Sequence, residues 1–155
     1  LSILFSLAII DYIYLWIPKS IVNIGILIGL TYQTLFMIKT TNVGSLLLTT
    51  EHIIAAFLGY ITFVLISKIG FYIYKKPAMG IGDAKIAALL GAWLGIKGLG
   101  LSVWLSFFIS GIIVVVGLIL KIIKPGQLIP FGSFLSISGI LVWILGDKIL
   151  ATLIF

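Results

Sequence analysis

Two aspartates lie in stretches that are otherwise apolar enough to cross a membrane. Asp11 lies in the run Leu1–Ile17, and Asp83 opens the run Asp83–Gly95. A carboxylate near the centre of a bilayer costs at least about 2.5–3.5 kcal/mol, so an acidic residue in such a segment indicates a functional site. The chain has only four acidic residues, and two of them are here. Two carboxylates that meet in one site are typical of acid–base catalysis, in which one holds a proton while the other acts as base.

The composition indicates an integral membrane protein. The chain has 155 residues, of which 62% are hydrophobic and 9% are charged, whereas a soluble domain is about 25% charged. The apolar runs have helical length and are separated by short polar breaks. We therefore expect an all-α, polytopic bundle of transmembrane helices that forms a single domain over residues 1–155.

Six membrane segments can be drawn from the apolar runs. Spanning a bilayer takes about 20 helical residues, so the run that opens at Asp83 is short. It must be buried among the others or continued by the glycine-rich stretch before or after it. A polar loop is expected over Lys39–Thr50, between the second and third segments. The six expected segments are 1–17, 20–38, 51–74, 83–95, 99–123 and 131–155.

The lysines predict how these segments are oriented in the membrane. The chain carries a net charge of +6, and its lysines flank the apolar segments, which favours membrane orientation over nucleic-acid binding. Because positive charge collects on the cytoplasmic side, the side with more lysines is expected to face the cytoplasm. Asp11 and Asp83 both fall near that face of a multi-pass inner-membrane protein. The cytoplasmic side holds Lys19, Lys68, Lys75, Lys76, Lys85, Lys121 and Lys124, and the other side holds Lys39, Lys97 and Lys148.

Each aspartate also has a purely structural interpretation. Asp83 follows Gly80-Ile81-Gly82, where glycines let other backbone come close, but an aspartate at a helix start can also be an N-cap. Asp11 near the end of its segment could instead reach water or pair with Lys19. The absence of cysteine and the single His52 exclude a cysteine zinc site and a multi-histidine cluster, and we expect neither a metal nor another cofactor.

Three motifs resemble the type IV prepilin peptidase family of Gly-x-Gly-Asp membrane aspartyl proteases. The first is Asp11 followed by Ile17-Pro18, and the second is Met79–Lys85 continuing through Ala88–Gly95. The third is Ile129–Leu135. They occur in the family's order and spread over most of the chain, so the resemblance is specific.

The resemblance implies an aspartic endopeptidase with Asp11 and Asp83 as its catalytic pair and no metal. The implied substrate is a prepilin, or a pseudopilin of type II secretion, whose short basic leader is cut off at the cytoplasmic membrane face. Gly80, Gly82 and Lys85 are expected to position the substrate. The segment Lys75–Gly82 is expected to act as a gate or platform for it.

The chain departs from the family pattern at several places. The stretch between Asp11 and Ile17 is aromatic and aliphatic rather than polar, and Ser133 stands where the family usually has proline. Nothing in the chain matches the N-terminal part of bacterial members, which carries a cysteine zinc site and N-methyltransferase activity. Methylation of the cleaved product therefore has no counterpart in this chain.

Three other functions remain open from the residues alone. A small transporter or channel subunit could use the aspartates for proton or cation coupling, although transporters more often show repeated halves with acids at the midplane. An assembly subunit of a pilus or secretion machine could use them as helix caps. Within the enzyme class, an intramembrane protease could cut another type II membrane protein.

Overall fold

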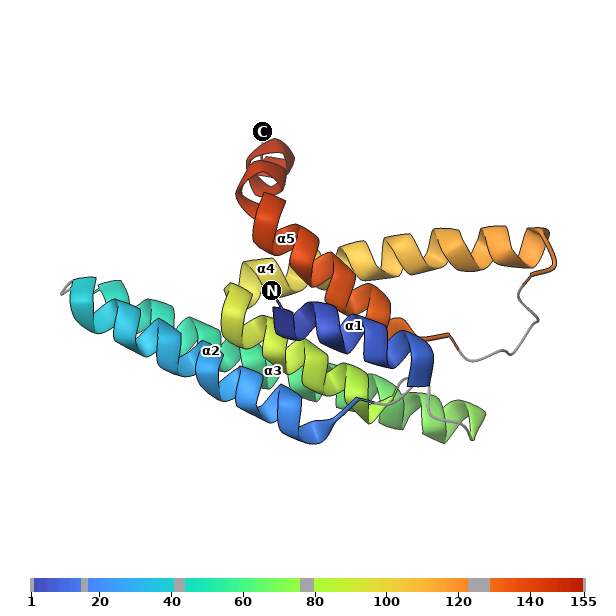
Figure 1. Cartoon of the computed structure of the whole chain (residues 1–155), viewed down its shortest axis with the longest axis horizontal. Coiled ribbons are helices and arrows are strands. Elements are labelled where there is room, and N and C mark those ends of the chain that lie inside the picture. The colour runs from blue at the N-terminus through green and yellow to red at the C-terminus, as the bar shows by residue number, and fades with distance from the viewer. Residues whose placement is uncertain (1, 15–16, 41–43, 76–79, 123–128, 155) are drawn as a thin grey trace.

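The structure, a computed structural model, is all-helical in the residues it describes, which confirms the all-α part of the predicted fold class. These residues are 2–14, 17–40, 44–75, 80–122 and 129–154, and the side chains at 36–49, 74 and 147–154 lie outside the description. No strand occurs in these ranges. The helices are α1 (Ser2–Tyr14), α2 (Lys19–Thr40), α3 (Gly44–Tyr74), α4 (Ile81–Ile119) and α5 (Phe131–Ile154) (Figure 1).

A sharp bend at Gly95 divides α4. Gly95 has φ 69° and ψ −172°, which are not helical values, and a positive φ is readily adopted only by glycine. Figure 1 shows the two halves of α4 leaving this bend like the arms of a V. The fourth and fifth expected segments thus lie in one bent helix, and the described chain has five helices rather than six separate ones.

The expected loop between the second and third segments was wrong. The polar loop over Lys39–Thr50 is largely helical, because α2 continues to Thr40 and α3 begins at Gly44. Threonine, asparagine and glycine made this stretch look like a loop, but the leucines that follow favour helix. Helix α4 begins at Ile81, within two residues of the expected start near Asp83.

The first half of α4 forms the centre of the bundle. Helices α2, α3 and α5 all pack against α4, and α1 packs mainly against α5. Ile86, Leu89 and Leu90 are almost completely buried, as expected for the short segment. At the α3–α4 contact, a Cβ atom on Gly91 would lie 2.5 Å from the carbonyl of Ala55, so a small residue lets the two backbones touch.

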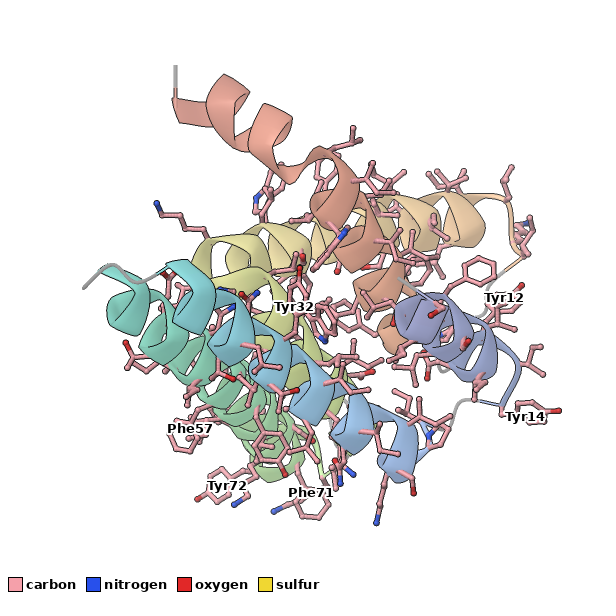
Figure 2. The ribbon with its side chains drawn as sticks, turned by 60° about the vertical axis from the view of Figure 1, so that its left-hand side comes forward. Tyr12, Tyr14, Tyr32, Phe57, Phe71 and Tyr72 are labelled. Atoms are coloured by element: carbon pink, nitrogen blue, oxygen red, sulfur yellow. The ribbon has the colours of Figure 1, made fainter. Side chains whose placement is uncertain are left out.

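Large apolar side chains cover much of the outside of the bundle. Figure 2 shows aromatic rings projecting from it, among them Tyr12 and Tyr72, which are 73% and 83% exposed. By length and composition, two stretches of the described helices could cross a membrane: Thr50–Ile73 and Ile81–Ile119. Outward-facing apolar surface of this kind is typical of a protein whose solvent is lipid.

Candidate active site

The last turn of α1 places Asp11 against the first turn of α5. Asp11 is only 5% exposed. Its Oδ2 atom accepts a hydrogen bond from the backbone amide of Ser133 at 2.7 Å and another from the Ser133 hydroxyl at 3.2 Å. Because α5 begins at Phe131, Ser133 lies where helical amides lack intrahelical partners. The buried Asp11 carboxylate therefore supplies a hydrogen-bond acceptor for the first turn of α5.

The first turn of α4 holds Asp83, which is 7% exposed. Gly80 is the N-cap of this helix, and its amide donates to Asp83 Oδ2 at 3.2 Å. The Gly132 amide also donates to the Asp83 carboxylate. The interpretation of Asp83 as the N-cap itself was thus wrong, because Asp83 is the third helical residue and bonds back to the cap in the manner of a capping box.

Gly132 lies directly against both carboxylates. A Cβ atom built on Gly132 would be 2.8 Å from Asp11 Oδ2 and 2.9 Å from Asp83 Oδ1. The two carboxylate oxygens are therefore no farther apart than the sum of these distances. The structure brings Asp11 and Asp83 together in one site, a proximity that the sequence could not establish.

Two helix N-termini, those of α4 and α5, point at this carboxylate pair. The positive end of a helix dipole stabilises a nearby negative charge, so the site can hold one ionised carboxylate in a largely buried position. Two negative charges at this separation repel each other, and carboxylate pairs of this kind share one proton. The arrangement thus suits a pair made of one acid and one base.

The pair opens into a cleft of about 570 Å³, here called the dyad cleft. Gly80, Gly82 and Lys85 all line it, as expected for residues near a bound substrate, although their role in substrate binding stays a prediction. The cleft also takes in residues that were not predicted to contact the substrate. These are Ile17, Lys19, Tyr60, Ile81, Ile129, Pro130 and Phe131.

The two motif glycines, Gly80 and Gly82, have different structural roles. A Cβ atom on Gly82 would lie 2.7 Å from Cδ1 and 3.2 Å from Cβ of Ile17, whereas a Cβ on Gly80 would meet nothing closer than 3.6 Å. Gly82 therefore makes room for Ile17, which closes one wall of the dyad cleft. The first and second sequence motifs are in direct contact at this point.

Gly82→Ala is expected to lower the stability of the folded protein by about 1–3 kcal/mol, the usual cost of an overpacked contact. Gly80→Ala is the matched control, because the same added methyl group fits there at ordinary contact distance and the φ of −71° suits alanine. Thermal unfolding in detergent measures both. Equal stability of the two variants would contradict the Ile17 contact.

Ser133 and Gly132 are the site residues whose roles the sequence reasoning missed. Both belong to the third motif, so the signal was present, but the motif does not show that its first helical turn faces the aspartates. The single hydroxyl hydrogen of Ser133 is shared between Asp11 Oδ2 and the carbonyl of Ala8, which lies 3.0 Å from the hydroxyl oxygen. Ser133 therefore joins α5 to α1 as well as holding Asp11.

Ser133→Ala is expected to destabilise the protein by about 1–3 kcal/mol, because the one hydroxyl donor that the buried Asp11 carboxylate and the Ala8 carbonyl share is lost. Ser110→Ala is the control, since the Ser110 hydroxyl donates to the carbonyl of Phe107 within its own helix. Chemical or thermal unfolding in detergent compares the two. A smaller loss at Ser133 than at Ser110 would argue against a role for Ser133 in joining α1 to α5.

Part of the predicted site lies outside the described residues. Residues 76–79 of the expected gate Lys75–Gly82 are not described, so its role stays a prediction. In the ranges that are described, the histidine, aspartate and glutamate side chains do not form a group of three that could hold a metal ion.

A pair of facing carboxylates at the base of an open cleft, inside an apolar helical protein, is what a membrane aspartic peptidase requires. The chain belongs to the type IV leader peptidase family, whose sequence pattern matches residues 1–120. The family match covers Asp11, Asp83 and the Gly80–Asp83 motif.

Several curated relatives share the name prepilin leader peptidase/N-methyltransferase. The chain is 30% identical over 149 residues to that of Pseudomonas putida, a match covering 96% of this chain and 49% of the relative. It is 31% identical over 149 residues to that of Legionella pneumophila, with the same two coverages. It is 40% identical to that of Pseudomonas aeruginosa over 86 residues, covering 53% of this chain and 30% of the relative.

The chain thus spans at most about half the length of these relatives. No solved structure shows a significant match to it.

Proposed function

We propose that this chain is a membrane aspartic endopeptidase that removes the short basic leader from type IV prepilins or pseudopilins. The observation that carries the proposal is the approach of Asp11 and Asp83 to the same face of Gly132. Family membership supports it, since the relatives named above are prepilin leader peptidases. Because those relatives are about twice as long, N-methyltransferase activity is not part of the proposal.

In the proposed mechanism, one carboxylate of the pair takes a proton from a water molecule in the dyad cleft. The water attacks the scissile carbonyl carbon, and the protonated partner donates to the developing oxyanion. Collapse of the tetrahedral intermediate breaks the C–N bond, and the leaving amine takes a proton from the pair. The two groups titrate as a unit, so the acid and base roles belong to the pair.

The proposed location is the cytoplasmic membrane, with several spans and with the dyad cleft toward the cytoplasm. The lysine bias supports this orientation, and Lys19 and Lys85 both line the dyad cleft. A site at this face reaches a cytoplasmic leader while the apolar helix of the substrate stays in the bilayer. The proposed partners are therefore the prepilin and the lipid bilayer, and nucleic acid is not among them.

The two non-enzymatic alternatives have less support. Asp83 does bond to the start of α4, as an assembly subunit with capping aspartates would require. A cap does not require a second buried carboxylate beside it, and a coupling site for ions does not require an open cleft of substrate size. Both features are needed for peptide hydrolysis.

The proposal is tested by incubating the purified chain, in detergent or in liposomes, with a full-length prepilin. Mass spectrometry is expected to find a leader fragment and a shortened pilin that begins after a glycine at the head of the apolar helix. Intact prepilin after incubation with folded protein would contradict the peptidase function and favour a non-proteolytic role.

A further inference from the structure

A second cleft lies beside the dyad cleft and has a different character. It has a volume of about 550 Å³ and is lined mainly by apolar side chains from the C-terminal half of α3 and the first turn of α4. We call it the apolar groove. Its apolar lining residues are Phe63, Val64, Phe71, Tyr72, Ile81 and Ala84.

The apolar groove adjoins the dyad cleft. Gly80 and Ile81 line both, so the N-terminus of α4 is a wall shared by the two. Ala84, which lines the groove and is 1% exposed, is the residue directly after Asp83. The groove therefore lies on the neighbouring face of the first turn of α4, because consecutive helical residues point about 100° apart.

The sides of the groove stand open while its floor is buried. Phe63 and Ala84 are almost fully buried, whereas Phe71 and Tyr72 are 56% and 83% exposed. Figure 2 shows the Phe71 and Tyr72 rings projecting from the same end of α3. Exposed aromatic rings beside a buried apolar floor are suited to hold apolar side chains of a partner helix.

We propose that the apolar groove binds the apolar, helix-forming segment of the substrate that follows the scissile bond. This inference rests on the proposed peptidase function and names where that substrate docks. The polar leader lies on the side of the dyad cleft, where Asp11, Asp83 and Lys85 are found. The scissile bond then lies at the shared Gly80–Ile81 wall, where the polar and apolar parts of the surface meet.

The size of the groove limits what it takes. A volume of about 550 Å³ is that of a small-molecule pocket, which ranges over about 300–1,000 Å³. It accommodates a few side chains from one face of a helix, and the rest of the helix faces lipid. The groove therefore contacts the first turns of the substrate's apolar segment, and these contacts contribute to substrate binding.

Lipid acyl chains are the competing occupant, because the groove opens on an apolar surface. Its position beside the dyad cleft favours the peptide, because a chain held at the carboxylates reaches the groove by passing the shared Gly80–Ile81 wall. An acyl chain would gain nothing from the carboxylates beside it. If the substrate helix occupies the groove, groove variants change the cleavage of a long substrate relative to a short one. If lipid occupies it, they do not.

The test compares two substrates in liposomes: a full-length prepilin, and a soluble peptide with the same leader that ends a few residues after the scissile bond. The measured quantity is the ratio of kcat/KM for the long substrate to kcat/KM for the short one. Phe71→Ala and Tyr72→Ala are each expected to lower this ratio about tenfold, the effect of losing the burial of an apolar side chain. Phe57→Ala is the matched control, because Phe57 is 63% exposed on the same helix and lines neither cleft.

The outcomes separate this inference from the function on which it rests. A lowered ratio in the two groove variants, with the ratio of Phe57→Ala at the wild-type value, supports docking of the substrate helix. A wild-type ratio in Phe71→Ala and Tyr72→Ala, with wild-type protein that cleaves both substrates, overturns the docking and leaves the peptidase intact. Wild-type protein that cleaves neither substrate overturns the peptidase function and the docking with it.

Discussion

Asp11→Asn and Asp83→Asn are each expected to lower prepilin cleavage by roughly 10²–10⁴-fold, the range contributed by a positioned acid or base. Either change leaves a neutral amide that cannot take a proton from water. The fold is expected to persist, because an amide oxygen can still accept the bonds donated by Ser133 to Asp11 and by Gly80 to Asp83. Initial rates of cleavage, together with protein levels in membranes, measure the effect.

Glu51→Gln is the matched control for this pair of variants. Glu51 is also a carboxylate of the helical bundle, but it lines a different cleft, together with His52 and Lys97. Its substitution is expected to leave cleavage near the wild-type rate. Full activity in Asp11→Asn or Asp83→Asn would contradict the two-carboxylate mechanism.

Gly132→Ala is expected to lower cleavage by about 10²-fold, because misplacing a reacting group by about 1 Å has an effect of that size. The added Cβ would lie 2.8 Å from Asp11 Oδ2 and 2.9 Å from Asp83 Oδ1, so at least one carboxylate must move. The variant keeps both aspartates and all of the motif's other residues. A loss of cleavage in Gly132→Ala therefore reflects a changed position of the two carboxylates, because both carboxylates are still present.

Gly100→Ala provides the comparison for Gly132→Ala. It adds the same methyl group to α4 at a position with nothing within 4 Å, and it is expected to retain wild-type cleavage. Thermal unfolding of both variants shows whether a loss of activity comes from unfolding. If Gly132→Ala cleaves prepilin as fast as Gly100→Ala, the carboxylates do not face Gly132 as the structure has them.

The sequence was most informative where single residues conflicted with their surroundings. Aspartate in an apolar run is costly, which singled out Asp11 and Asp83 without any structural knowledge. The Gly80–Asp83 motif placed a helix start within two residues of its observed position. Apolar runs of helical length were enough to predict an all-α protein.

The sequence was least informative about contacts between distant parts of the chain. The bond from Ser133 to Asp11 joins residues 122 positions apart, and no local pattern predicts it. The same holds for Gly82, whose missing side chain makes room for Ile17. Local propensity identifies a glycine, but only the packed structure shows which neighbour requires it.

The prediction of helix boundaries was inaccurate for a related reason. The polar residues over Lys39–Thr50 predict a loop, yet α3 begins at Gly44. Gly95 shows the opposite case: the sequence placed the end of a segment there, and the structure has a bend with positive φ inside α4. Composition thus located the irregular point without showing that the helix continues beyond it.

The central claim is that Asp11 and Asp83 work as one catalytic unit, and a double-mutant comparison tests it most directly. Single-turnover cleavage of prepilin is measured with excess enzyme for Asp11→Asn, for Asp83→Asn and for the protein carrying both changes. Groups that act together show strongly non-additive losses. The protein with both changes is therefore expected to be no slower than the slower single variant. A loss equal to the product of the two single losses would contradict the claim, because it would mean that the two carboxylates act independently.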